Sequence, residues 1–113
     1  MRKLNQSDHE NVMKLLGKKP AENLFTLWGI ESYGYLADIQ TLWGQFDSKG
    51  DLIAVLCKFK NKYTPYWETE CNLQKFADII NTDTNEKEVN GIERLTKEIE
   101  PFITDGYDKR ESY

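Results

Sequence analysis

Hydrophobic and polar positions alternate most clearly in the segment TLWGQFDSKGDLIAVLCKF, residues 41–59. An alternating run, a break at DSKGD and a second apolar run together predict a β-hairpin. Gly50 can adopt the positive φ that closes such a turn, and Asp47 can accept hydrogen bonds from the turn backbone. The second run, residues 52–57, is apolar at consecutive positions, so we expect other elements to cover both faces of its sheet.

Helical periodicity appears on both sides of the hairpin. Ser7, followed by Glu10 three positions later, matches a capping box and predicts the start of a first helix. Pro20 suits the first position of a second helix, which we expect to be interrupted near Gly29. After the hairpin, Asn72 is expected to cap a third helix with an apolar face.

The remaining segments predict strands and one more helix. Residues 1–6 suit a short first strand, and residues 61–71 a third meander strand in which Pro65 marks an edge or a bulge. A short strand is expected at KEV. A final amphipathic helix follows Asn90-Gly91 and is broken at Pro101.

This order of elements predicts an α+β fold with α/β layering. Its mixed, mostly antiparallel sheet would be flanked by helices, because the meander strands are joined by connections too short for crossovers. We expect a single domain over residues 1–104, followed by a polar tail over residues 105–113.

Composition excludes several classes of function. The chain has 113 residues and a net charge of −4, and its 15 Lys and Arg residues are scattered among 19 acidic ones, so we expect no nucleic-acid partner. No apolar run suits a signal peptide or a membrane span, so a cytoplasmic location is expected. Cys57 and Cys71 form no Cys-x-x-Cys pair and are expected to be reduced thiols, and no metal site is expected.

Few residues suggest catalytic chemistry. His9 is the single histidine, and its acidic and hydroxyl neighbours are better explained by helix capping than by a triad. Glu68 and Glu70 would lie about 7 Å apart on one face of a strand, a spacing open to acid–base work but better explained as an acidic edge. No two glycines are closer than five residues, so we expect no phosphate cradle.

The element order, with the segments MRKLNQSDHENVMKLL, KKPAENLF, IESYGY, LWGQFDSKGDLIAVL and EVNGIERLTKEIEPF, resembles the GCN5-related N-acetyltransferase (GNAT) superfamily. More narrowly, the chain resembles the N-terminal domain of two-domain acetyltransferases from Gram-positive bacteria. In that family a Gly-x-Gly or Gly-x-Ala signature, between a central strand and the helix after it, holds the pyrophosphate of acetyl-CoA. No segment here matches this signature, so the resemblance assigns no catalytic or cofactor residue.

The resemblance implies an acetyltransferase-like domain without independent activity, lacking the C-terminal acetyl-CoA-binding part. We expect the sequence to end where that part would begin, as a natural truncation, a fragment or half of a split enzyme. By analogy, a substrate or partner groove would involve Asn23, Tyr33 and Tyr35. The expected partner is a catalytic GNAT domain, which would supply any acetyl-CoA site, or a second copy of the chain; no membrane partner is expected.

Two alternatives remain open at this point. The chain could be a free-standing interaction module that self-associates through exposed apolar surface and open strand edges. It could also be an N-acetyltransferase with a non-standard acetyl-CoA site, for which the start of the last helix at Asn90-Gly91 is the nearest approach to a cradle.

Overall fold

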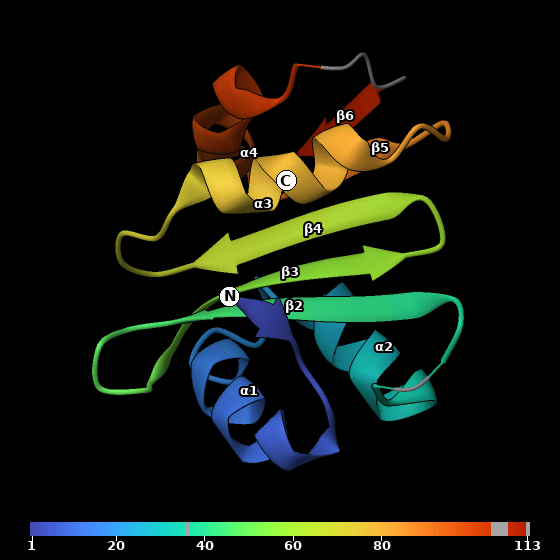
Figure 1. Ribbon diagram of the computed structural model, residues 1–113. Helices are drawn as coiled ribbons and strands as arrows, with labels where there is room; N and C mark the ends of the chain where they lie inside the picture. Colours follow the sequence, from blue (N-terminus) through green and yellow to red (C-terminus); the bar gives the residue numbers. More distant parts are fainter. Residues whose placement is uncertain (36, 105–108, 113) are drawn as a thin grey trace.

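The computed structural model describes residues 1–35, 37–104 and 109–112 and contains both strands and helices (Figure 1). In this part of the chain the strands are β1 (Arg2–Lys3), β2 (Gln40–Phe46), β3 (Leu52–Phe59), β4 (Lys62–Trp67), β5 (Glu88–Gly91) and β6 (Lys109–Ser112). The helices are α1 (His9–Leu16), α2 (Leu24–Tyr33), α3 (Leu73–Thr82) and α4 (Glu93–Ile99), with 3-10 turns η1 (Gln6–Asp8) before α1 and η2 (Glu100–Phe102) after α4.

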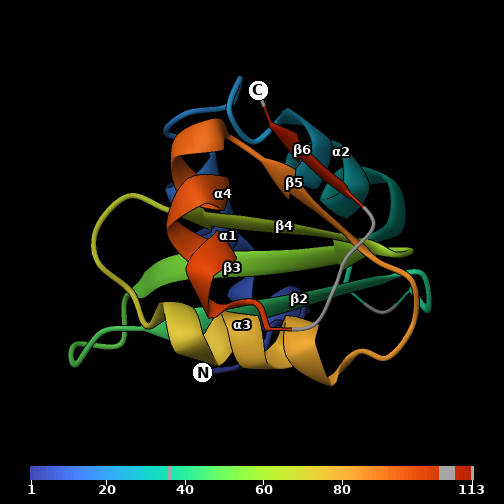
Figure 2. The ribbon, with the colours of Figure 1, turned by 90° about the horizontal axis from the view of Figure 1, so that it is seen from above.

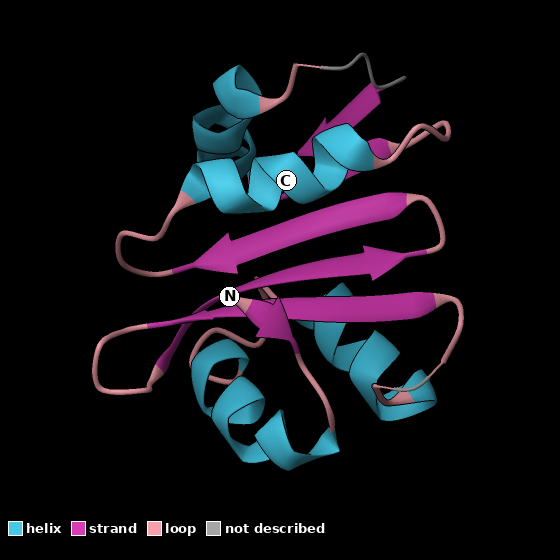
Figure 3. Ribbon diagram, in the orientation of Figure 1, coloured by secondary structure: helices cyan, strands magenta, loops and turns pink. Residues whose placement is uncertain are grey.

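The strands form one sheet in sequence order, β1-β2-β3-β4-β5-β6 (Figure 3). Neighbours from β1 to β4 are antiparallel, whereas β4 pairs with β5, and β5 with β6, in parallel. The parallel pairs are joined through α3 and α4, as parallel connections require. The predicted α+β class and the antiparallel meander are therefore confirmed.

Helices cover both faces of this sheet. Figures 1 and 2 show α1 and α2 against one face and α3 and α4 against the other. Ala54, Val55 and Leu56 of β3 are successive residues with at most 1% of their surface exposed. The expectation from the apolar run at residues 52–57 is confirmed, because β3 is buried from both sides.

The hairpin turn also forms as expected. Asp47 Oδ1 accepts hydrogen bonds of 2.9 Å from the backbone N–H groups of Lys49 and Asp51. Gly50 has a φ of 88°, a region that side chains other than glycine rarely adopt. Hydrogen bonds within the turn and the conformation of Gly50 therefore close it, and packing against the core is not required.

The first helix begins differently from the prediction. The capping box uses Asn5 and Asp8, and not Ser7 and Glu10: Asn5 Oδ1 accepts from the N–H of Ser7, and Asp8 Oδ2 accepts from the N–H of Asn5. An Asx residue two positions earlier is an equally good cap, and Asp8 is also held by an arginine that the spacing rule does not consider.

The second helix is shorter at its start than predicted. It begins at Leu24, and residues 20–23 form turns after Pro20. Asn23 fixes these turns, since its side-chain amide donates to the carbonyl oxygens of Leu16 and Lys19 at 3.1 and 3.2 Å. The predicted interruption near Gly29 is wrong, because α2 runs through this residue unbroken.

The later elements lie where the sequence predicts them, but β4 ends at Trp67, before the predicted end at residue 71, and one strand is added. Pro65 lies within β4, which pairs with β5 only at Lys62 and Tyr63, so the missing N–H of the proline falls where pairing on that side has ended. Residues 109–112 form β6, a strand that the sequence did not indicate. The rest of the predicted polar tail, residues 105–108 and 113, lies outside the described residues.

Gly29 shows why α2 carries a glycine in its interior. A Cβ at this position would overlap Oε1 of Gln40, whose amide is buried beneath the helix. Gln40 Nε2 donates to the carbonyl oxygens of Gly29 and Gly34 at 3.1 and 2.8 Å. The glycine therefore makes room for a side chain that ties the end of α2 to β2.

We expect Gly29→Ala to lower the free energy of unfolding by about 1–3 kcal/mol, because the added methyl group displaces the Gln40 amide. Alanine normally stabilises a helix interior by about 1 kcal/mol relative to glycine, so a loss would identify the overlap. Urea denaturation measures the change. Ser32→Ala, at an exposed position of the same helix, is the matched control and should be neutral or slightly stabilising. Stabilisation by Gly29→Ala would contradict the packing described.

Candidate functional site

A cavity of about 330 Å³ lies between α2 and the sheet. Five elements contribute to its wall: α2, the first residue of β2, the end of β3, the beginning of β4 and β5. The lining residues are Phe25, Thr26, Trp28, Gln40, Cys57, Phe59, Lys62, Thr64 and Asn90. Aromatic side chains thus combine with two amides, two hydroxyls, one thiol and one ammonium group.

Two amide oxygens in this wall are buried without a hydrogen bond among the described residues. They are Oε1 of Gln40 and Oδ1 of Asn90. Gln40 is only 2% exposed, and its Oε1 faces the backbone of Gly29. A buried acceptor without a donor costs free energy, so each of these oxygens is a place where a donor would be favourable.

The thiol in the wall is not a nucleophile at neutral pH. Cys57 is 4% exposed, and burial raises the pKa of its thiol to about 12, although a hydrogen bond with Thr26 opposes the shift. Burial likewise raises the pKa of Cys71, to about 11. Both cysteines therefore carry a proton at neutral pH, and neither supplies a thiolate.

Aromatic rings form a cluster beside the cavity. Trp28 packs edge-to-face on Tyr33 and on Phe59, with ring centroids 5.8 and 6.1 Å apart, and Tyr33 lies 5.6 Å from Phe59. Trp28 and Tyr33 nevertheless remain 51% and 42% exposed. The cluster orders the rings of α2 against the end of β3 while leaving apolar surface in contact with water.

The three predicted groove residues have different surroundings. Tyr33 belongs to the aromatic cluster, whereas Tyr35 is buried and its hydroxyl lies 2.9 Å from Nδ1 of His9. Asn23 is 4% exposed and bonds the backbone between α1 and α2. Each residue thus has its own set of partners, and none of the three lines the cavity.

The other candidates for chemistry serve local structure. His9 packs edge-to-face on Tyr35, with ring centroids 5.8 Å apart. Glu68 and Glu70 were expected on one face of a strand, which is wrong because β4 ends at Trp67. Glu68 accepts a hydrogen bond of 3.3 Å from the hydroxyl of Tyr66.

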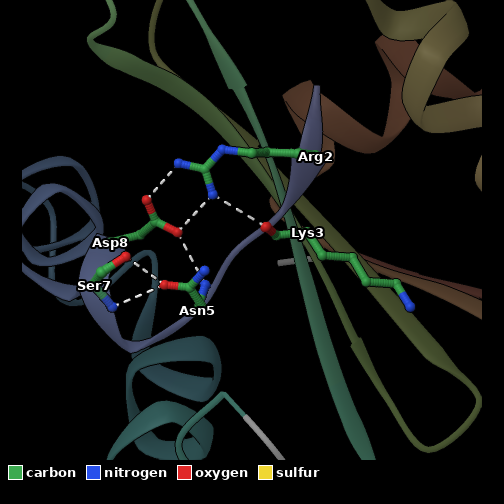
Figure 4. Close-up of polar contacts among 5 residues, drawn as sticks. All are labelled: Arg2, Lys3, Asn5, Ser7 and Asp8. Carbon is green, nitrogen blue, oxygen red and sulfur yellow. Dashed lines mark hydrogen bonds and ion pairs between the residues drawn. The ribbon is translucent and has the colours of Figure 1, made fainter.

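A polar cluster ties the N-terminus to α1 (Figure 4). Two nitrogens of the Arg2 guanidinium donate to the two carboxylate oxygens of Asp8 at 2.8 and 2.7 Å. This hydrogen bonding lowers the pKa of Asp8, against a smaller opposing effect of burial. Asp8 also holds the N–H of Asn5, so its bonds are taken by the cap and by β1. The cluster is structural.

A second polar cluster ties α3 to the sheet. Asp83, the residue after α3, accepts a hydrogen bond of 2.6 Å from the hydroxyl of Tyr63 and lies 3.3 Å from the ammonium group of Lys58. Burial raises the pKa of Asp83, but hydrogen bonds from Tyr63, the N–H of Asn85 and Lys58 outweigh it and lower the pKa to about 2. The buried Lys87 ammonium donates to the carbonyl oxygen of Asp83.

Sequence reasoning missed the cavity residues Gln40, Phe59 and Asn90 as a group. The available signals were a glutamine at the start of a mostly buried strand and a glycine inside an apolar helix. Asn90 was interpreted as part of a turn or a cap and, with Gly91, as the nearest approach to a phosphate cradle. Nothing in the spacing of these residues indicates that one cavity brings them together.

Comparison with known proteins adds no assignment: no family model, no curated protein and no solved structure matches this chain. Within the described ranges, no helix combines the length and apolar content needed to cross a bilayer. Over the same residues, His, Cys, Asp and Glu side chains form no group of three that could hold a metal ion.

The Asp83 cluster predicts a pH dependence of stability. A pKa that folding lowers from about 3.9 to about 2 stabilises the protein above pH 4, and this contribution is lost as the pH falls from about 4 to 2. Asp83→Asn should therefore reduce the free energy of unfolding by about 1–2 kcal/mol at pH 7 and by little at pH 2. Urea denaturation at both values measures this difference. Asp78→Asn, at an exposed position of α3, is the control. An equal loss at both pH values would contradict the assignment.

Proposed function

We propose that this chain is an acetyltransferase-like domain that does not bind acetyl-CoA on its own and that acts through a partner. The order of elements in the described residues, from β1 through α1 and α2 to the meander, α3, β5 and α4, is the order on which the resemblance to the GNAT superfamily rests. This agreement supports the family proposal, while the absence of any matching protein leaves it resting on the element order and the quoted segments.

The connection between β4 and α3 is the observation that carries the absence of activity. The resemblance assigns the pyrophosphate signature to the C-terminal acetyl-CoA-binding part, but this connection joins a central strand to the next helix in the same way and is therefore the place to compare with it. Here it contains Glu68 and Glu70, whose carboxylates repel a pyrophosphate, and no glycine. A phosphate would therefore meet negative charge and side chains instead of free backbone amides.

Two N–H groups at the start of α3, those of Asn72 and Lys75, are already occupied. Asn72 Oδ1 accepts from the N–H of Lys75 at 3.2 Å. Gln45 of β2 binds the backbone of Asn72 with both ends of its amide. Its Oε1 accepts from the N–H of Asn72 at 2.8 Å, and its Nε2 donates to the Asn72 carbonyl oxygen at 2.7 Å. Protein groups thus satisfy two of the donors that an anion would need.

Titration with acetyl-CoA tests this proposal. We expect no saturable heat in isothermal titration calorimetry of the purified chain, because the β4–α3 connection offers acidic side chains and occupied amides. An active acetyltransferase titrated in parallel is the positive control. Binding at micromolar concentration would contradict the proposal and favour the alternative of a non-standard acetyl-CoA site.

Exposed apolar residues on α2 favour a second candidate function, a module that associates with a second copy of itself. Leu24, Phe25 and Trp28 are 63%, 70% and 51% exposed. The helix is apolar over most of its length, LFTLWGIESY, although a surface helix normally carries polar residues on its outer face. Such a helix is expected to be covered when the protein performs its function.

Self-association would place α2 in the interface. Analytical ultracentrifugation should then show a dimer for the wild-type chain, and Leu24→Lys should weaken it by at least about tenfold, because a charge would be buried between the copies. Met13→Lys, at a 39% exposed position on α1, is the matched control and should leave the dimer unchanged. A wild-type chain that stays monomeric over the accessible concentration range would exclude this candidate.

A further inference from the structure

We propose that the cavity between α2 and the sheet binds a small molecule with a flat aromatic body, a hydrogen-bond donor at its buried end and an anionic group at its mouth. The proposal rests on the wall of the cavity and does not depend on the acetyltransferase-like assignment. Three properties of the wall define the ligand: its size and aromatic lining, its unpartnered amide oxygens, and its charge.

Size and lining favour an aromatic body. The cavity measures about 330 Å³, whereas an apolar cavity of roughly 150 Å³ is enough to hold benzene. Phe25, Trp28 and Phe59 line it, and Trp28 and Phe59 fix each other by their edge-to-face contact. A ligand with two fused rings would fill this space and stack on side chains that are already ordered.

The buried amides favour a donor on the ligand. Gln40 is held by the two hydrogen bonds that its Nε2 donates, and its Oε1 faces Gly29, so it offers little freedom to turn. Asn90, in contrast, lines the cavity from β5, and its buried Oδ1 has no hydrogen bond among the described residues. We therefore assign Asn90 as the acceptor for an N–H or O–H group of the ligand.

Charge at the mouth decides between an anionic and a cationic ligand. Lys62 is exposed and lines the cavity, and no ion pair involves it among the described residues. Lys60 lies nearby, with its ammonium group 5.7 Å from the ring centre of Phe59. Glu88, the register partner of Lys62, is adjacent on β5 but does not line the cavity. An aromatic ammonium compound would meet the ammonium group of Lys62, whereas a carboxylate would pair with it.

Indoleacetate is a suitable probe because it combines two fused rings, a ring N–H and a carboxylate. We expect it to perturb the resonances of residues 25–28, Phe59, Lys62 and the Asn90 side-chain amide in heteronuclear NMR spectra of the isotope-labelled chain, saturably and below millimolar concentration. Its N-methyl derivative, which lacks the donor, should bind about tenfold more weakly. Tryptamine, the cationic analogue, should also bind more weakly.

Three variants test whether the probe binds in the cavity between α2 and the sheet. Asn90→Leu should remove the preference for indoleacetate over its N-methyl derivative, and Thr64→Phe, which fills the cavity, should abolish binding of both. Leu24→Ser, at an exposed apolar position of α2 outside the cavity wall, is the matched control and should bind indoleacetate like the wild type. Circular dichroism melting shows whether each variant is folded.

Comparison of the probes on the wild-type chain keeps the proposal testable even if a variant does not fold. Absence of saturable shifts would overturn it, as would shifts centred on Leu24 and Tyr33 instead of the cavity wall. Equal binding of indoleacetate and its N-methyl derivative would overturn the role of Asn90. Tighter binding of tryptamine would overturn the role of Lys62.

Discussion

Burial of β3 on both faces is the constraint on which the rest of the structure depends. Ala54, Val55 and Leu56 point alternately to opposite sides of the sheet, and each is almost completely buried. Removing both sides of one strand from water requires a helical layer on each side, which places α1 and α2 on one face and α3 and α4 on the other (Figure 2). The cavity lies under one of these layers and owes its existence to this arrangement.

The change from antiparallel to parallel pairing makes the cavity possible. β4 pairs with β5 at Lys62 and Tyr63 only, and Pro65 has no N–H with which to extend the pairing. On β5, Gly91 has a φ of 137°, a conformation that turns the chain toward α4. Thr64 and Asn90 therefore face the α2 side at the point where regular pairing of the two strands ends, and α2 covers them incompletely.

Sequence patterns predicted those features that depend on neighbours along the chain. The hairpin at residues 41–59 forms as expected because Asp47 and Gly50 determine its turn locally. The predicted start of α2 was wrong because the side chain of Asn23 donates hydrogen bonds to carbonyl groups of the preceding turn. The periodicity of apolar residues does not indicate such a bond. β6 was missed because residues 109–112 are polar, and a strand at the sheet edge needs only backbone pairing with β5.

The cavity could not be predicted because it depends on residues that lie far apart in the sequence. Gln40 and Asn90 are fifty positions apart in the sequence, and each has an ordinary local explanation as a strand residue or a turn residue. Only the fold places both amide oxygens in the wall of one cavity, where they lack donors among the described residues. A protein without a use for this space would lose little by replacing Asn90 with an apolar residue of similar size, since removing a buried unpaired acceptor is neutral or stabilising. The presence of the amide is therefore better explained by a group that binds to it than by the stability of the fold.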